Sequence, residues 1–218
     1  MRKLVLYGAS YPEPVKLIHR INASRPSWEL VGFIDDVKAG KQTDFMGFPI
    51  LGGEAVIPEL QARYGDALLF CNNVFSSTRT RAAVTAKMEC YGVKYATLIS
   101  PDVDTALSTI GEGSMIMPGV CIGTNAKIGR HVAIRLGSIV NHDNEIDDLV
   151  FIGPGVTLCG RVRLLEGAYI GAGAVVREDV VVGRFATVGL GAGAVRDVAD
   201  GETVVGTPAR PIKKSAAT

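Results

Sequence analysis

A histidine and an aspartate, His142 and Asp143, are neighbours in the segment SIVNHDNEIDDL, inside one of the most regular stretches of the sequence. Imidazole titrates nearest to neutral pH, so this side chain can accept a proton from an attacking nucleophile. An adjacent carboxylate can fix the tautomer of the ring and favour its protonated form. Because successive residues of a flat strand point to opposite faces, the pair can cooperate only where the backbone turns. A lone turn histidine usually has no such role, and the surrounding pattern decides between these interpretations.

Composition restricts the class of protein. The 218 residues suffice for one large or two modest domains, and we expect two. The 23 basic and 22 acidic residues nearly balance, so the net charge does not indicate binding to nucleic acid or to an anionic membrane. We therefore expect a small-molecule partner. No apolar run has the length of a signal peptide or a membrane span. The irregular spacing of the cysteines argues against a zinc cluster or a disulfide framework and predicts a soluble, cytoplasmic protein. They are Cys71, Cys90, Cys121 and Cys159.

Aliphatic residues recur at every sixth position over the second half of the chain. The series is Ile110, Ile116, Ile122, Ile128, Ile134, Val140, Ile146, Ile152, Leu158, Leu164, Ile170, Val176, Val182, Val188 and Ala194. The residues four positions later, from Ser114 to Val198, are nearly all small or β-branched. This period fits neither an α-helix nor a hairpin meander. It indicates short β segments and tight turns, three to a coil, stacked as a parallel β-helix of five coils.

The corners of these coils need special backbone conformations. A glycine directly follows many of the aliphatic residues, and we expect it to supply the conformational freedom of the corner. These glycines are Gly111, Gly123, Gly129, Gly153, Gly171, Gly183 and Gly189. His142 and Asp143 come two and three residues after Val140 of the aliphatic series, a register that allows a corner. His131 and His19 have no comparable context, and we expect surface or packing roles for them.

Residues 1–100 alternate apolar strands with helical patterns. KLVLYGAS, WELVGFIDD, ALLFCNN and KYATLIS are predicted strands, and PEPVKLIHRIN, EAVIPELQARYG and SSTRTRAAVTAKMECYG are predicted helices. Residues 36–53 are expected to form a loop. Alternating β and α elements with nearly continuous apolar strands indicate a parallel sheet covered by helices, which is a Rossmann-like α/β domain.

Ligands of such sheets bind at the carboxyl ends of the strands. Gly8, Ala9 and Ser10 follow the first strand, and Asp35 and Asp36 follow the second, so these residues mark one candidate crevice. Each has a plain alternative: the glycine can serve a tight turn, and the aspartates can begin a turn after a strand.

Several motifs together carry a family resemblance over essentially the whole chain. LYGAS and GFIDD precede a hexapeptide array that contains SMIMPGVCIGTNAKIG and VNHDNEIDDLVFIGPGVTLCG, and the sequence continues into VVGTPAR. This combination resembles the bacterial sugar acyltransferases, which comprise sialic-acid O-acetyltransferases and nucleotide-linked 4-amino-sugar N-acetyltransferases. The similarity is most specific around His142 and GTPAR.

The resemblance implies an architecture and a set of partners. Residues 1–100 would form the nucleotide-sugar-binding domain, and residues 101–218 a left-handed β-helix acyltransferase domain with a C-terminal tail. The family forms homotrimers, uses acetyl-CoA without a metal, and holds a nucleotide-sugar between the N-terminal domain and a neighbouring prism.

The resemblance also implies roles for individual residues of the β-helix. His142 matches the family's general base, with Asp143 beside it where the family often has Glu. Gly160 matches a glycine whose N–H group binds the acetyl carbonyl, where a fixed donor stabilises the developing oxyanion. Further contacts to CoA map to Ala172 and Leu190, with Phe151 near the thioester.

The N-terminal match is looser. Family members continue the first glycine turn as Gly-His-Gly, whereas this chain has YGASYPEP, in which Tyr11 adds bulk and Pro12 lacks an N–H donor. Asp35 and Asp36 fit the acidic pair that contacts base or ribose. The glycines that border the same pocket would be Gly52 and Gly53.

These observations favour an acetyl-CoA-dependent N-acetyltransferase of a nucleotide-linked amino-deoxysugar used for surface polysaccharides. An O-acetyltransferase acting on a sugar or sialic acid, and a trimeric sugar-binding scaffold without catalysis, stay open. A hexapeptide carbonic anhydrase would need three zinc-binding histidines, which His131 and His142 cannot supply.

Overall fold

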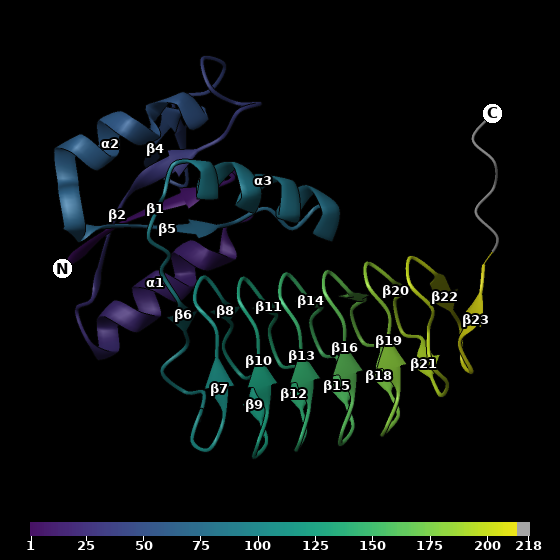
Figure 1. The fold of residues 1–218 in the computed structure, drawn as a ribbon. Coiled ribbons are helices and arrows are strands. Elements are labelled where there is room, and N and C mark those ends of the chain that lie inside the picture. Colours follow the sequence, from purple (N-terminus) through teal and green to yellow (C-terminus); the bar gives the residue numbers. More distant parts are fainter. Residues whose placement is uncertain (213–218) are drawn as a thin grey trace, which may run out of the picture. The chain divides into compact units, whose positions relative to one another are not determined.

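The computed structural model describes residues 1–212, and the chain divides into two compact units (Figure 1). One comprises residues 1–101 with 112–115, and the other comprises residues 102–111 with the chain from residue 116 onward. The last residues of the predicted C-terminal tail, 213–218, lie outside the described part.

The first unit contains a five-stranded sheet in the order β3-β4-β2-β1-β5. Its strands are β1 (Arg2–Tyr7), β2 (Trp28–Ile34), β3 (Asp44–Phe45), β4 (Phe48–Gly52) and β5 (Leu68–Asn72). Its helices are α1 (Glu13–Ser24), α2 (Ile57–Tyr64) and α3 (Thr78–Cys90), with 3₁₀ turns at Glu54–Val56 and Gly65–Ala67. All pairings are parallel except that of β3 with β4. The predicted Rossmann-like arrangement is therefore present.

Alternating side chains of β1 give this sheet two buried faces. Val5 and Tyr7 pack in one cluster with Ile57 of α2 and Met88 of α3. Leu4 belongs to the opposite set of β1 side chains and is also fully buried. Figure 1 shows α1 on one side of this sheet and α2 and α3 on the other.

Two predictions for this unit need correction. Residues 36–53 are not a plain loop, because β3 and β4 form a hairpin and β4 extends the sheet beside β2. The hairpin turns at Met46 and Gly47, both with positive φ, and only the glycine signals such a turn in the sequence. The strand expected in KYATLIS is reduced to β6 (Leu98–Ile99) and an isolated bridge between Tyr95 and Phe70.

The β-helix contains a long run of two-residue strands, and the second residue of each strand in this run is a member of the predicted aliphatic series. They are β7 (Thr109–Ile110), β8 (Met115–Ile116), β9 (Cys121–Ile122), β10 (Lys127–Ile128), β11 (Ala133–Ile134), β12 (Ile139–Val140), β13 (Glu145–Ile146), β14 (Phe151–Ile152), β15 (Thr157–Leu158), β16 (Arg163–Leu164), β17 (Tyr169–Ile170), β18 (Val175–Val176), β19 (Val181–Val182), β20 (Thr187–Val188) and β21 (Gly193–Ala194). The six-residue period thus located each of these strands.

Strands eighteen residues apart pair in parallel, for example at Ile128 and Ile146. This pairing gives the β-helix three faces. The face made of β7, β10, β13, β16 and β19 is the charged face, and the face made of β9, β12, β15, β18 and β21 is the uncharged face. The third face continues beyond β20 into β22 (Thr203–Val205) and β23 (Arg210–Pro211). All of the aliphatic series except Ile110 and Ile122 are buried, so the ladder forms the core.

The glycines after the aliphatic residues have a different role from the one expected. None of the seven has a positive φ. A Cβ on Gly153 would instead lie 2.6 Å from the backbone nitrogen of Ala172 in the next coil. These glycines therefore allow successive coils to approach closely. Positive φ occurs later in the turns, for example at Gly155 and Gly173.

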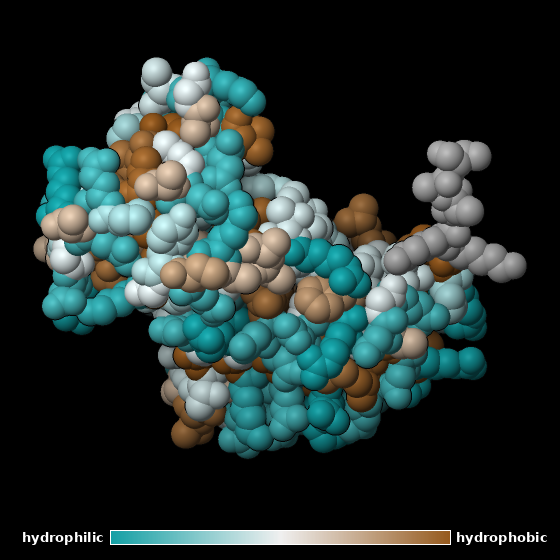
Figure 2. Space-filling view, turned by 45° about the horizontal axis from the view of Figure 1, so that its top comes forward, coloured by the Kyte–Doolittle hydropathy of each residue, from teal (hydrophilic) through white to brown (hydrophobic). Residues whose placement is uncertain are grey.

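The surface of the β-helix in the view of Figure 2 is mostly hydrophilic, with apolar residues in short stretches between polar ones. This distribution agrees with a core filled by the inward-pointing ladder. No helix within residues 1–212 has the length and hydrophobicity needed to cross a membrane.

We predict that Gly153→Ala destabilises the protein by about 1–3 kcal/mol, because the added methyl group overlaps the next coil. Chemical denaturation monitored by circular dichroism measures this change. Gly155→Asn is the matched control, since that position has a φ of 65° and open space around it, and asparagine accepts this conformation. Equal stability of Gly153→Ala and the unmodified protein would contradict the close-approach explanation.

Candidate active site

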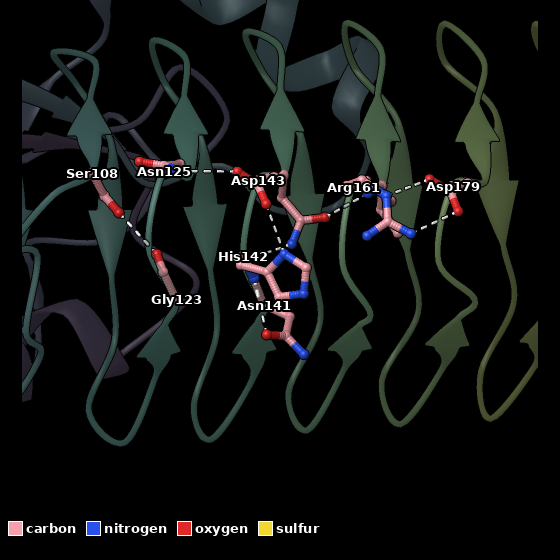
Figure 3. Close-up of polar contacts among 10 residues, drawn as sticks. Ser108, Gly123, Asn125, Asn141, His142, Asp143, Arg161 and Asp179 are labelled. Atoms are coloured by element: carbon pink, nitrogen blue, oxygen red, sulfur yellow. Dashed lines mark hydrogen bonds and ion pairs between the residues drawn. The ribbon is translucent and has the colours of Figure 1, made fainter.

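His142 lies on a corner of the β-helix, in the turn between β12 and β13 (Figure 3). Asp143 has a φ of 57°, so the chain turns there from one face to the next and the two adjacent side chains face each other. The Nδ1 atom of His142 is 2.8 Å from Oδ2 of Asp143. The structure therefore brings this pair together in the way that the sequence required.

The amide side chains of Asn144 and Asn141, the first buried and the second exposed, hold the corner. Asn144 is fully buried, donates a hydrogen bond of 2.7 Å to the Asn141 carbonyl and accepts one of 2.9 Å from the N–H of Val162. The Asn141 side chain accepts a hydrogen bond from the N–H of His142. Sequence analysis did not assign Asn144 to the site. Its signal is an amide in a series that is otherwise almost entirely small or β-branched.

The Asp143 carboxylate has a second partner. Its Oδ1 accepts a hydrogen bond of 3.1 Å from Nδ2 of Asn125, one coil earlier. The hydrogen bond with His142 and then the one from Asn125 lower the pKa of Asp143, so the carboxylate stays ionised. With the Nδ1 proton directed to Asp143, Nε2 of His142 is the ring atom that can accept a proton.

The imidazole ring packs on Gly160. A Cβ on this glycine would lie 2.5 Å from Cε1 and 2.7 Å from Nε2 of His142. The corresponding positions one coil before and after are His142 itself and Glu178, and two coils before it is Thr124, so this corner position tolerates a side chain elsewhere in the column. A glycine is therefore needed at position 160, where the ring of His142 covers the backbone.

The other predicted CoA contacts do not join this corner within one chain. Ala172 and Leu190 follow β17 and β20, so they lie on the opposite edge of the uncharged face from His142. Leu190 is 77% exposed. Phe151 lies on the third face and stacks on Tyr169, with ring centroids 4.8 Å apart. The GTPAR segment borders the Leu190 edge, because the N–H of Ala209 donates to the Gly193 carbonyl.

A separate pocket of about 550 Å³ lies in the first unit at the carboxyl ends of β1, β2 and β5. Its lining includes four of the predicted residues, Gly8, Ser10, Asp35 and Asp36. It also includes Tyr7, Asn73 and Lys87, which sequence analysis missed. Asn73 had a signal, because it is a polar residue directly after an apolar strand, whereas Tyr7 and Lys87 meet only through the tertiary fold.

Several backbone groups that were predicted to bind a ligand are already hydrogen-bonded within the protein. Asp35 accepts hydrogen bonds from the N–H groups of Ala9, Val37 and Lys38, so it stabilises its own turn as the plain alternative held. The Ala9 carbonyl accepts a hydrogen bond from the Lys38 ammonium group. The Gly8 carbonyl is bonded to Asn73. Asp35 therefore lines the pocket with its carboxylate already bonded within the protein, whereas Ala9 is fully buried and does not line the pocket.

Asp36 is held from three sides. It accepts hydrogen bonds from the Tyr7 hydroxyl (2.7 Å), the Glu54 N–H (2.8 Å) and the Lys87 ammonium group (3.1 Å). Burial raises the pKa of Asp36, but these hydrogen bonds outweigh it and the net effect is a lowered pKa. Burial and then the hydrogen bond to Asp36 raise the pKa of Tyr7. A Cβ on Gly53 would lie 3.0 Å from Oδ1 of Asp36, so Gly53 borders this cluster from behind.

The altered glycine loop has its own supports. Tyr11 packs edge to face on Phe75 with ring centroids 5.2 Å apart, and its carbonyl accepts a hydrogen bond from Asn73. Pro12 precedes α1, where the missing N–H does not disturb the helix. No group of three or more possible metal ligands occurs among the residues that the structure describes.

Comparison with known proteins finds relatives that share one activity, acetyl transfer. No protein-family model matches the chain. GDP-perosamine N-acetyltransferase of Escherichia coli is 35% identical over 189 residues, which cover 84% of this chain and 82% of that protein. A crystal structure of a histidine-to-alanine mutant of GDP-perosamine N-acetyltransferase from Caulobacter crescentus, in complex with CoA and GDP-perosamine, matches with a TM-score of 0.86 and 26% identity over 97% of both chains. The acetyltransferase domain of PglB from Neisseria gonorrhoeae, in complex with acetyl coenzyme A, matches with a TM-score of 0.83 and 29% identity over 97% of this chain and 99% of that domain.

The chain therefore belongs to the hexapeptide-repeat N-acetyltransferases of nucleotide-linked amino sugars, which use acetyl-CoA. The predicted family, enzyme class, co-substrate and fold class, a Rossmann-like domain followed by a left-handed parallel β-helix, are confirmed.

We predict that Gly160→Ala keeps the thermal stability of the protein but lowers its acetyl-transfer turnover by about 10²-fold, because the new methyl group displaces the His142 ring. Steady-state kinetics and thermal unfolding measure the two effects. In the background of His142→Ala the substitution should have little further effect. An equal loss in that background would show that the added methyl group acts independently of the ring and would contradict this explanation.

Proposed function

We propose that this chain transfers the acetyl group of acetyl-CoA to the amino group of a GDP-linked amino-deoxysugar, with His142 as general base. The observation that carries the proposal is the His142 ring, held by Asp143 at 2.8 Å and packed on Gly160 at an exposed corner. The two GDP-perosamine N-acetyltransferases among the similar proteins support the choice of nucleotide and of nitrogen as the acceptor.

In the proposed reaction the sugar amine attacks the thioester carbonyl while Nε2 of His142 takes the amine proton. The ionised Asp143 is a positioning residue that stabilises the imidazolium as it forms. The N–H group of Gly160 stabilises the oxyanion. Collapse of the tetrahedral intermediate breaks the carbon–sulfur bond, and the proton passes from His142 to the CoA sulfur. The acetyl group moves directly, without a covalent acyl-enzyme.

We assign the nucleotide to the pocket of the first unit. The carboxyl ends of parallel strands are the usual ligand site in such sheets, and a volume of about 550 Å³ suits a compact organic ligand. Gly8, Ser10 and Asp36 would contact the nucleotide, whereas Ala9, Asp35 and Gly53 would shape the pocket. The hydrogen bonds within the protein favour this division.

We further propose a homotrimer packed through the uncharged face. Ile139 and Val175 on this face are 43% and 46% exposed, whereas the charged face carries Lys127, Glu145 and Arg163 at the equivalent positions. One edge of the uncharged face carries His142, and the opposite edge carries the CoA candidates Ala172 and Leu190. Three copies packed by this face would set the His142 edge of one copy beside the CoA edge of the next. Phe151 would then line the approach to the thioester.

We also propose that the protein is located in the cytoplasm. Acetyl-CoA and nucleotide-sugars are cytoplasmic metabolites in the resembled family, and all four cysteines are free thiols, one of them buried. Reduced thiols are typical of that compartment.

We expect His142→Ala to lower turnover by roughly 10²–10⁴-fold with an unchanged fold, because this is the usual contribution of a general base. The measurement is acetyl-CoA consumption with GDP-linked amino sugars, and UDP- and dTDP-linked sugars test the nucleotide. His19→Ala is the matched control, since His19 is an exposed histidine on α1. Normal turnover of His142→Ala would refute the assignment. Products acetylated on oxygen, or no turnover by the unmodified chain with any sugar, would favour the O-acetyltransferase or the scaffold.

Val175→Lys should convert the trimer into monomers and abolish acetyl transfer, because three buried lysines would meet at the packed face. Size-exclusion chromatography with light scattering measures the mass. Val181→Lys introduces the same change at the equivalent strand position of the charged face and should leave a trimer. A trimeric Val175→Lys variant would place the subunit interface elsewhere.

A further inference from the structure

Four residues spaced by eighteen stack on the corner that carries Asp143. They are Asn125, Asp143, Arg161 and Asp179, and all four have φ values between 57° and 63°. Because they share one position in successive coils, their side chains leave the same edge of the β-helix, as Figure 3 shows. The column therefore places an amide, a carboxylate, a guanidinium group and a second carboxylate in a row.

Arg161 lies between two carboxylates of this column. Successive coils lie about 4.8 Å apart, so Asp143 and Asp179 are its neighbours on either side. The N–H of Arg161 donates to the His142 carbonyl, which places the Arg161 backbone directly beside the pair. Its side chain nevertheless turns away from Asp143 and binds Asp179 through two hydrogen bonds, Nε to Oδ1 at 2.6 Å and a terminal nitrogen to Oδ2 at 2.9 Å.

Stability alone gives little reason for this ion pair. The side chains of Arg161 and Asp179 are 51% and 61% exposed, and exposed ion pairs contribute little to folding. The consequence for Asp143 is larger. A guanidinium group makes two parallel hydrogen bonds to a carboxylate, which are stronger than the single one from a neutral imidazole. Without Asp179 as its partner, Arg161 would therefore compete with His142 for Asp143.

We propose that Asp179 is a positioning residue that holds Arg161 away from Asp143 and thereby keeps Asp143 paired with His142. Asn125 completes the arrangement from the other side, because it occupies Oδ1 of Asp143 and leaves Oδ2 for the ring. The inference rests on the proposed function in so far as it links this geometry to turnover. It assigns no contact with substrate to Asp179 or Arg161.

The decisive experiment compares Asp179→Asn with the double variant Asp179→Asn/Arg161→Gln. Asp179→Asn releases the guanidinium group, and we expect kcat to fall by about tenfold with an unchanged KM for acetyl-CoA, since orientation accounts for part of a general-base contribution. The double variant removes the competitor and should regain most of the lost turnover. An ion pair that only stabilises the fold would give a double variant no better than the single one, and that result would overturn the proposal.

Glu166→Gln is the matched control. It breaks the ion pair between Arg184 and Glu166, which also joins residues eighteen apart at 2.7 Å but lies beside no histidine pair. Its kcat should equal that of the unmodified protein. A tenfold loss in this control would show that any broken ion pair between coils impairs the enzyme, and would also overturn the proposal.

Long-range ¹H–¹⁵N correlation of the histidine rings tests the geometry without reference to catalysis. His142 should carry its neutral-form proton mainly on Nδ1 in the unmodified protein, shift toward Nε2 in Asp179→Asn and return in the double variant. An unchanged tautomer in Asp179→Asn would refute the positioning role. If the tautomer shifts as expected while His142→Ala retains normal turnover, the positioning role stands and only the proposed function fails.

Discussion

The β-helix depends on one constraint: equivalent residues of successive coils are hydrogen-bonded neighbours, eighteen positions apart. The parallel pairs of Ile128 with Ile146 and of Val140 with Leu158 show this register, and the buried aliphatic ladder holds it. A shift by one residue would move the ladder to the surface. Glycines such as Gly153 sharpen the constraint, since the next coil leaves no room for a Cβ. The coils therefore fit together in a single register.

This register produces the candidate site. His142 lies over Gly160, and Asp143 lies beside Asn125, because each of these pairs is separated by eighteen residues. The left-handed conformation that a corner requires, with φ of 57° at Asp143, also directs that side chain toward its sequence neighbour. Polar side chains on such a fold therefore form columns along one edge. The strands between the corners provide the aliphatic core and set the distance between successive members of a column.

The sequence predicted the β-helix almost strand by strand, because one residue type at one period reports directly on burial. It failed where the cause lies in a contact between distant segments. The glycines after the ladder looked like corner residues, and the hairpin of β3 and β4 was hidden because Met46 is an unusual residue for positive φ. His142 and Asp143 were found by residue type. Asn125, Arg161 and Asp179 become visible only once steps of eighteen are taken from Asp143, which requires the coil length first.

Exposure explains why the His142 pair needs these neighbours. Both side chains of the pair are nearly half exposed, at 45% and 46%, which leaves the ring accessible from solvent. Water competes for the hydrogen bond of an exposed pair and lets its side chains rotate, so burial cannot restrain the pair here. The restraint has to come from the rigid coils on either side, which place Asn125 against one carboxylate oxygen of Asp143 and draw the competing Arg161 toward Asp179. A stiff prism with polar residues along one edge thus provides both an open site and a fixed orientation.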